Sequence, residues 1–436
     1  MLSLKKIKEL RDQFISPSLS VAYKDPLYIV KGEGQYLYNS NGKKYLDAIN
    51  NISHVGHCHP EVTKALHEQS KTLNTNTRYL HENIVIYAQE LLRTLPSHLQ
   101  TCFFTNSGSE SNDLALRLAR NYTSSKHTIV IEGAYHGHTA ATMEASPYKY
   151  NGQGGNSAAK YIHQIPMPDA YRGRYRENSA DIIEYYIKHV ESILDSLKKK
   201  DEQISVFISE SILGCGGQII LPEGFLALAN KTIKKAGGIC IADEVQIGFG
   251  RVGSHFWGFE SENTVPDIIT MGKAMGNGHP LSAVVTTKEI AQKFNNGMEY
   301  FNSFGGNPVS CAVGRTVLEI IEKEKLQENA YLIGKYLIKG LNDIKKRHNL
   351  IGDVRGRGLF LGIELIRDHE KMAPACSEAD QIVNDMKERG ILISTDGIDR
   401  NVIKIKPPMV FTKDNADQLI DTLDQLLIKK KYNQLI

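Results

Sequence analysis

Short apolar runs alternate with amphipathic helical stretches through the middle of the chain. The runs with the composition of strands are TCFFTNSG (101–108), HTIVIE (127–132), ISVFIS (204–209), GGICIAD (237–243), PDIITMG (266–272) and LSAVVTT (281–287). Helical periodicity lies between several of them, for example over 111–120 and 223–236. Strands that alternate with helices pair into a mostly parallel sheet whose two faces are covered by helices. The pattern therefore predicts an α/β fold.

The two ends of the chain follow a different pattern. A long helical stretch runs over 307–348, and a strand-like run, a helix over 379–390, two strand-like pieces and a last helix follow it. Residues 28–47 have the pattern of a small hairpin sheet that turns at Asn41 and Gly42. Because 436 residues exceed one ordinary core, we predict a large domain over 61–320 and a smaller α+β domain from 1–60 and 321–436. The segment 150–160, rich in Gly and Asn, is predicted to be a mobile loop.

Charge, cysteines and hydropathy exclude several classes of protein. The chain has 52 basic and 49 acidic residues, and its basic runs 198–200 and 429–431 are as short as solvated helix faces or ends, so we expect no nucleic-acid partner. The six cysteines are far apart without a C-x-x-C pair, which predicts neither a disulfide framework nor a zinc site. Charges interrupt the leucines of the N-terminal stretch, and no apolar run is long enough for a membrane span. We therefore expect a cytoplasmic location and no membrane partner.

A candidate anion site follows the first predicted strand. Ser107, Gly108 and Ser109 lie between this strand and a helix, and the S-x-x-E spacing from Ser107 to Glu110 is that of a capping box. Free N–H groups, two hydroxyls and a glycine that admits a ligand make this helix start suitable for a phosphate. An ordinary capped helix would have the same sequence.

Three ionisable residues follow other predicted strands: Glu210, Asp243 and Lys273. A buried carboxylate such as that of Asp243 is costly unless it faces a cation or a donor. Lys273 lies among Gly, Ala and Met in ITMGKAMGNGHPLSA (269–283), where burial favours the neutral amine, although a lysine that extends to solvent is the commoner case. Since ligands of such sheets bind at the carboxyl ends of the strands, we expect these residues to lie together.

Tyr135 and His136 also follow a strand, where a flat ring could stack on a planar cofactor or belong to the core. A phosphate site, a buried aspartate, a stacking ring and a lysine able to lose its charge are what pyridoxal 5'-phosphate (PLP) requires. This cofactor has an anchored phosphate, a protonated pyridine nitrogen and an aldehyde held as a Schiff base.

Two further motifs have simpler explanations. His54, His57 and His59 in HVGHCHPEV lack the spacing of a helical metal pair and a companion carboxylate, so we expect a loop of hydrogen-bonded histidines and no metal. The G-x-G-x-x-G over 248–253 is followed by no helical period, which argues against a dinucleotide site.

With these motifs the chain resembles the class III aminotransferases, PLP enzymes of fold type I. The shared segments are TNSGSESNDLALRLAR, AYHGH, ADEVQIGFGR, MGKAMGNG and FGGNPVSCAVG. HVGHCHPEV, YRGRYRE, GMEYFNSFGGNPVSCAVG, STDG and IKPPM further resemble the branch of ethanolamine-phosphate and phosphohydroxylysine phospho-lyases. The likeness runs from about residue 20 to the C-terminus.

The resemblance implies roles for named residues. Lys273 matches the Schiff-base lysine, Asp243 the partner of the pyridine nitrogen, and Gln246 the donor to the ring hydroxyl. The other positions expected to lie around the cofactor are Ser107, Gly108 and Ser109 at its phosphate, Tyr135 stacked on its ring with His136 beside it, and Glu210 nearby. Ser303 matches a residue that reaches the phosphate of the neighbouring subunit, which implies a homodimer with shared active sites.

One departure from the family bears on the reaction. Amino-acid aminotransferases of this family have a glutamate and an arginine at two positions where this chain has Cys215 and Lys404. In those enzymes the glutamate and the arginine pair and separate as amine and oxo-acid substrates alternate. Lysine lacks the bidentate clamp of arginine for a carboxylate, and cysteine cannot form the ion pair. The departure favours chemistry with one substrate.

We therefore predict a PLP enzyme that acts on a small primary amine and releases phosphate and ammonia from a phosphorylated amine. Lys404 and Arg172 are candidate cations for the substrate phosphate. The alternative is an aminotransferase that moves the amino group to a 2-oxo acid such as pyruvate or glyoxylate, and a third reading is a cofactor-binding protein without activity.

Overall fold

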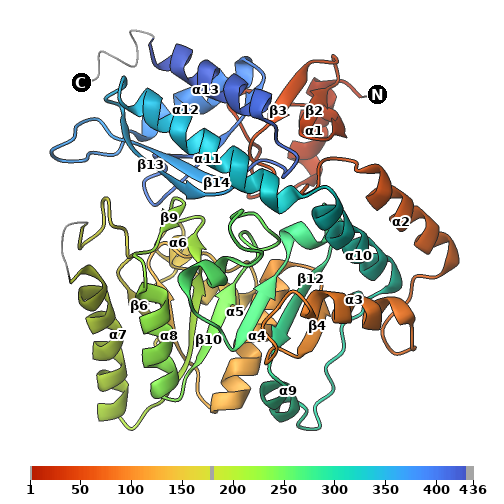
Figure 1. Cartoon of the computed structure of the whole chain (residues 1–436), viewed down its shortest axis with the longest axis vertical. Coiled ribbons are helices and arrows are strands. Elements are labelled where there is room, and N and C mark those ends of the chain that lie inside the picture. Colours follow the sequence, from red (N-terminus) through yellow and green to blue (C-terminus); the bar gives the residue numbers. More distant parts are fainter. Residues whose placement is uncertain (1, 177–180, 429–436) are drawn as a thin grey trace.

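The computed structural model describes residues 2–176 and 181–428 (Figure 1), so the lysine run 429–431 lies outside the described residues. Its largest sheet has seven strands in the order β4-β12-β11-β10-β7-β5-β6. Neighbours from β11 to β6 pair in parallel, whereas β12 is antiparallel to both of its neighbours. The strands are β4 (Thr101–Thr105), β5 (His127–Ile131), β6 (Ile162–Ile165), β7 (Ile204–Glu210), β10 (Ile239–Asp243), β11 (Ile268–Met271) and β12 (Ser282–Thr286).

Alternating side chains of these strands pack on helices at opposite faces of the sheet. Val130, Val206 and Ile241 pack with helices α4 (Gly108–Thr123) and α9 (Lys288–Phe294). Ile129 and Phe207 instead pack with α7 (Ile182–Lys199) and α8 (Phe225–Lys235). Strand residues one apart point to opposite faces, so the predicted α/β arrangement with a mostly parallel, covered sheet is confirmed.

Two smaller sheets carry the ends of the chain. The strands β1 (Ile29–Glu33), β2 (Tyr36–Asn39) and β3 (Lys44–Asp47) form the predicted hairpins, and β3 pairs in parallel with β15 (Ile391–Leu392) from the far end of the chain. The second sheet is antiparallel, in the order β13 (Ile351–Arg357), β14 (Phe360–Leu365), β17 (Val402–Ile405) and β16 (Ser394–Asp396). The α+β unit predicted from the N- and C-terminal segments is therefore confirmed as part of the fold.

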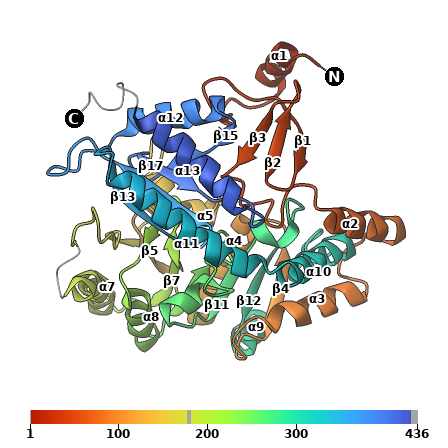
Figure 2. The same cartoon turned by 45° about the horizontal axis from the view of Figure 1, so that its top comes forward.

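Helices cover these sheets and connect them to the central one. Figure 2 shows α11 (Leu326–Lys345) and α13 (Lys413–Leu427) side by side, with α12 (Cys376–Glu388) beyond them. The other helices are α1 (Leu4–Phe14), α2 (Pro60–Thr72), α3 (Glu82–Leu92), the short α5 (Ala140–Glu144) and α6 (Pro147–Tyr150), and α10 (Pro308–Lys323). None of the helices in 2–176 and 181–428 is long and apolar enough to cross a membrane.

The predicted long helical stretch over 307–348 is two helices, α10 and α11. The chain turns at Lys325, whose φ of 53° is left-handed. Packing explains the break: α10 packs on α2 and α3, whereas α11 packs on β13 and α13. No Gly or Pro marks this turn in the sequence, so periodicity alone did not reveal it.

Candidate active site

A cavity of about 330 Å³ lies where the strands β4, β7, β10 and β11 end. Nine of the predicted site residues line it: Ser107, Gly108, Ser109, Tyr135, His136, Glu210, Asp243, Gln246 and Lys273. The carboxyl ends of the strands thus bring together residues that lie up to 166 positions apart in the sequence. Asn112 and Ile52 also line the cavity and were not predicted.

The start of α4 forms one wall of this cavity. Ser107 caps the helix, its Oγ accepting the N–H of Glu110 at 3.2 Å. The capping box is only half formed, because the Glu110 carboxylate accepts the N–H of Asn106 at 2.8 Å rather than that of the cap residue. Within the described residues the N–H groups of Gly108 and Ser109 have no acceptor. The helix start therefore offers two unused donors to an anion in the cavity.

Asp243 ends β10 and is held by three donors. Its Oδ2 accepts from Asn112 Nδ2 and from His136 Nδ1, each at 2.8 Å, and its Oδ1 accepts the N–H of Val245 at 3.1 Å. Asn112 is itself fixed, because its Oδ1 accepts the Thr270 hydroxyl at 2.6 Å. The carboxylate is 4% exposed and keeps one orientation toward the cavity.

Glu210 lies beside Asp243 in the paired strands β7 and β10. Burial, reinforced by the charge of Asp243, raises the pKa of Glu210 to about 7. Its oxygens accept the N–H groups of Gly214 at 2.9 Å and Tyr135 at 3.4 Å. Glu210 thus fixes the segment around Gly214 and the backbone of Tyr135. With this pKa, its carboxyl gains and loses its proton near neutral pH.

Lys273 lies two residues after β11 and lines the cavity. Burial lowers the pKa of Lys273, the charge of Lys406 lowers it further, and the charge of Asp243 opposes the shift. Its Nζ has no hydrogen-bond or ion-pair partner within residues 2–176 and 181–428. A buried amine without a partner favours the neutral, nucleophilic form.

Lys406, which the sequence reasoning missed, lies beside the predicted residue Gln246. Lys406 Nζ donates to Gln246 Oε1 at 3.1 Å, and Asn51 Nδ2 donates to the same oxygen at 3.2 Å. Lys406 also pairs with Asp396 Oδ2 at 3.2 Å, while Lys404 pairs with Asp396 Oδ1 at 2.8 Å. Two lysines therefore share one carboxylate. Their spacing of two in KIKPP was the available signal, because it places them on one face of a strand.

Three predicted residues lie outside this cavity. Lys404 is held at Asp396, and Arg172 pairs with Glu364 at 2.5 Å and Asp399 at 2.7 Å. Ser303 lies on an exposed loop. The neighbouring Asn302 ties this loop to the start of α4, since its Oδ1 accepts from Asn106 Nδ2 at 3.1 Å.

The predicted histidine loop is hydrogen-bonded. His57 Nε2 lies 2.6 Å from Asp47, and its Nδ1 lies 3.0 Å from the Ser53 hydroxyl. His59 caps α2 through its Nδ1, and His54 contacts the carbonyl of Phe249 at 2.8 Å. Each of these imidazoles therefore has a protein partner, as predicted. The expectation that the histidines lack a companion carboxylate was wrong, because Asp47 meets His57 and Glu324 meets His59 at 3.0 Å, and both carboxylates come from other parts of the sequence.

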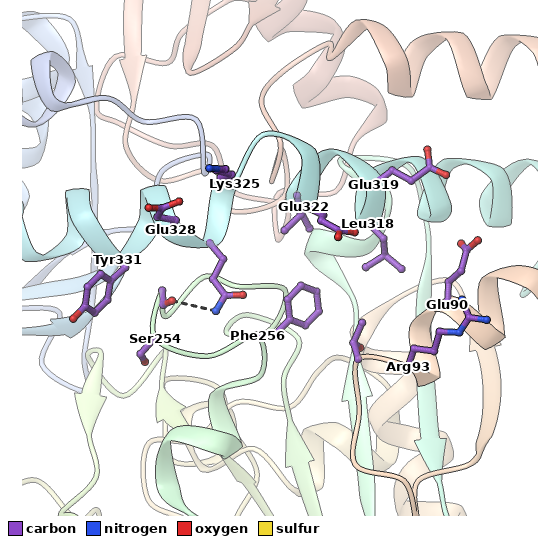
Figure 3. A pocket seen from close by; sticks show the side chains of 14 residues that line it. Glu90, Arg93, Ser254, Phe256, Leu318, Glu319, Glu322, Lys325, Glu328 and Tyr331 are labelled. Atoms are coloured by element: carbon purple, nitrogen blue, oxygen red, sulfur yellow. Dashed lines mark hydrogen bonds between the residues drawn. The ribbon is translucent and has the colours of Figure 1, made fainter.

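A larger cavity of about 1040 Å³ lies elsewhere, between α3, the turn from α10 to α11 and the loop around Ser254 (Figure 3). Carboxylates of Glu319, Glu322 and Glu328 surround an apolar floor that includes Phe256. None of the predicted site residues lines it. The larger of the two cavities is therefore not the one that contains the predicted site residues.

The donors left unused around the smaller cavity fit PLP. The N–H groups at the start of α4 suit its phosphate, and Asp243 suits a protonated ring nitrogen. With Gln246 Oε1 occupied by Asn51 and Lys406, the Nε2 of Gln246 has no acceptor within the described part of the chain. Lys273 has a free amine for an aldehyde. The residues present therefore fit the cofactor.

Comparison with known proteins agrees with this geometry. The family model "Aminotransferase class-III" matches residues 19–427. A Drosophila melanogaster protein named "Alanine--glyoxylate aminotransferase 2-like" is 48% identical and covers 96% of this chain and 86% of its own length. Ethanolamine-phosphate phospho-lyase homolog 1 of Caenorhabditis elegans is 40% identical, covering 98% and 94%.

A solved structure extends the comparison. It is an Arthrobacter phospholyase in complex with phosphoethanolamine, 38% identical, with a TM-score of 0.92 over 97% of this chain and 99% of that one. Sequence and fold thus agree over nearly the whole chain. The protein belongs to the class III aminotransferase family of PLP-dependent enzymes, with fold type I.

Proposed function

We propose that this enzyme is a phospho-lyase that releases phosphate and ammonia from a small phosphorylated primary amine. The observation that carries the proposal is the pair Lys404 and Lys406, which share the single carboxylate of Asp396 next to Gln246, a residue that lines the cavity. One positive charge is left over for a substrate anion. The names of the Caenorhabditis relative and the Arthrobacter structure support the same reaction.

The cofactor contacts are proposed from the residues that line the cavity. The N–H groups of Gly108 and Ser109, with the hydroxyls of Ser107 and Ser109, would bind its phosphate. Asp243 would hold a proton on the ring nitrogen, and the Tyr135 ring would stack on the ring face with His136 behind it. Bound PLP supplies an electron sink for the carbon that carries the amine.

Lys273 performs two roles in this proposal. Its neutral Nζ would hold the cofactor through the aldehyde and, once the substrate amine has taken that place, would accept a proton from the amine-bearing carbon. Phosphate would then leave from the adjacent carbon with the electrons of the broken C–O bond, near the charges of Lys404 and Lys406 on Asp396. Water would convert the remaining carbon skeleton to an aldehyde and free ammonia. Arg172 contributes no free charge, because Glu364 and Asp399 already pair with it.

Borohydride reduction tests the role of Lys273. The purified protein should be yellow, and reduction should fix a pyridoxyl label on Lys273 that peptide mass spectrometry locates. Lys273→Ala should bind the cofactor only non-covalently. Recovery of the label on another lysine would remove this assignment.

The reaction is tested with phosphoethanolamine and related phosphorylated amines in the absence of any oxo acid. We expect inorganic phosphate and ammonia in equal amounts. Lys406→Met should raise the KM for the phosphorylated amine about tenfold or more, because a charge pair with phosphate is lost. Lys413→Met, a matched change at an exposed lysine paired with Asp417, should leave it unchanged.

The name of the Drosophila relative favours the alternative, transfer of the amino group to an oxo acid. That reading predicts no phosphate release, together with turnover of an amino acid only when glyoxylate or pyruvate is present. The absence of an arginine at position 404 argues against it, since lysine lacks the bidentate clamp for a carboxylate.

A homodimer with shared sites is part of the proposal. Tyr79, Leu80, Met298 and Phe304 are exposed large apolar side chains on two segments that the Arg78–Glu299 ion pair joins. Exposed apolar side chains gathered in this way are typical of an interface. Ser303 lies on the same surface and would extend its hydroxyl to the phosphate of the partner.

We also propose a cytoplasmic location. All six cysteines lie within the described residues and are unpaired, which suits a reducing compartment. Because some relatives are named as mitochondrial, fractionation of cells with the native protein is the deciding experiment.

A further inference from the structure

Arg251 is a buried cation without a counter-ion. The residue is 1% exposed, and within residues 2–176 and 181–428 no carboxylate pairs with it. Its Nη1 donates to the carbonyl oxygens of Leu359 and Pro407, each at 2.9 Å, and its Nη2 donates to His54 Nδ1 at 3.2 Å. Burial lowers the pKa of Arg251 to about 9, so it still carries its charge at neutral pH. A buried charge that meets only neutral acceptors is costly.

The partners of Arg251 belong to the same three chain segments that meet around Gln246. The inner contact, next to the cavity, joins Asn51, Gln246 and Lys406. A second contact lies one to five residues further along each segment and joins His54, Arg251 and Pro407. Lys406 and Pro407 are neighbours in the chain. Any shift of the Pro407 carbonyl therefore moves the backbone that carries the Lys406 ammonium.

The main chain adds support to this arrangement from two sides. The N–H of Leu359 donates to the carbonyl of Arg251 at 3.0 Å, so Arg251 and Leu359 are bonded in both directions. The N–H of Lys406 donates to Ala48, and that of Met409 donates to His54. A planar guanidinium can bridge two carbonyls and an imidazole at once, which a lysine amine on a flexible stem does less well.

We propose that Arg251 is a positioning residue that acts through Pro407 to hold the Lys406 ammonium on Gln246, beside Lys273. The inference deepens the proposed function, in which Lys406 faces the substrate and Lys273 carries the cofactor. It concerns only the placement of protein groups, so it can be tested without the cofactor.

The pKa of the Lys273 amine depends on how close the Lys406 ammonium lies. Four charged or titratable groups face it: Lys406, Asp243, Cys215 and Glu210. The positive charge of Lys406 lowers the pKa of Lys273, and the three acidic groups raise it. If Lys406 moves away, less of the Lys273 amine is neutral at a given pH and it reacts more slowly with an acylating reagent.

The experiment measures the rate at which acetic anhydride labels Lys273 in the full-length chain stripped of cofactor, by peptide mass spectrometry across a range of pH. Lys406→Gln and Arg251→Lys should each slow labelling at neutral pH roughly threefold to tenfold. The double variant should be no slower than Lys406→Gln alone. Arg357→Lys is the matched control, because Arg357 is paired with Glu262, and it should label at the normal rate.

Three results would overturn the proposal. One is a normal labelling rate in Arg251→Lys alongside slow labelling in Lys406→Gln. The second is an Arg251→Lys effect that persists in the Lys406→Gln background, and the third is a Lys406→Gln variant that labels normally. Should the arginine variant not fold, His54→Gln removes the Nδ1 acceptor of Arg251 and is read by the same criteria. Loss of the borohydride label on Lys273 would instead remove the proposed function and leave this labelling test intact.

Discussion

Asp243 illustrates how neighbouring side chains set up one chemical group. Asn112, His136 and the N–H of Val245 occupy lone pairs of its carboxylate, and Thr270 in turn orients Asn112. Asp243 was predicted from its place at the end of a strand. Asn112 was not, because an asparagine within a helix gives no sign in the sequence of which side chain it will meet.

We expect Asp243→Asn to lower kcat by a factor on the order of a hundred to a thousand, as loss of a preorganised charge does in other enzymes. The amide keeps the size of the carboxylate, so the melting temperature should change little. Stopped-flow kinetics with the cofactor-loaded variant measure the effect. Near-normal turnover would make Asp243 a structural residue only.

The raised pKa of Glu210 has a consequence for stability. Burial favours the protonated carboxyl in the folded chain, with a pKa of about 7, whereas the unfolded chain has the ordinary lower value. The folded state therefore binds more protons between these two values, and this group makes stability fall as the pH rises through that window.

Glu210→Gln removes that titration. The variant should gain stability relative to the native protein from about pH 4.5 to about pH 7, by about 3 kcal/mol in total. Urea unfolding at several pH values measures the difference. Glu191→Gln, at an exposed site, is the control. A difference that does not depend on pH would contradict the assignment.

At the scale of elements, the start of α4 is packed closely on the loop that follows β10. A Cβ on Gly108 would lie 2.6 Å from Cγ1 of Val245, well inside contact distance. This glycine therefore lets two of the strand ends approach each other at the anion site.

We expect Gly108→Ala to destabilise the protein by about 1–3 kcal/mol and to weaken cofactor binding, because the helix start must move away from the loop. Val245→Ala in the same chain should restore most of both. Thermal unfolding and cofactor titration provide the measurements. If Val245→Ala gives no rescue, the close contact is not the cause.

Elements differ in how far the sequence could predict them. The strand ends that carry Ser107, Glu210, Asp243 and Lys273 followed from apolar runs, since a buried strand has few alternatives. The sequence did not predict roles for Asp396 and Lys406, in and next to the sheet of β13 to β17, or the hydrogen bonds of the buried Arg251. Their side-chain partners lie up to 197 residues away in the sequence, and lysines in or next to a short strand look like surface residues until the pairing is known. The boundaries at residues 60 and 320 and the mobility of 150–160 stay predictions.

For the molecule as a whole, the exposed apolar side chains near Phe304 predict the quaternary state. Phe304 is 71% exposed and lies next to Ser303. Phe304→Glu should turn the proposed dimer into monomers. Cofactor affinity should fall at the same time, because the Ser303 hydroxyl no longer reaches the cofactor phosphate in the other subunit. Analytical ultracentrifugation with cofactor titration checks both. Ile428→Glu, at an exposed position on another surface, should leave the dimer intact, and a fully loaded, active monomer would rule the arrangement out.

The pairing of β3 with β15 also sets an order of events during synthesis. Leu46 and Ala48 bond to Gly390 and Leu392, so the first sheet of the chain lacks its fourth strand until the ribosome has made β15 (Ile391–Leu392). The carbonyl of Ala48 likewise waits for the N–H of Lys406. Contacts this distant in sequence form slowly and leave apolar surface uncovered in the meantime. Nascent chains stalled before residue 390 should therefore be cut by protease within residues 20–60, whereas chains stalled after the last helix has emerged should be protected there.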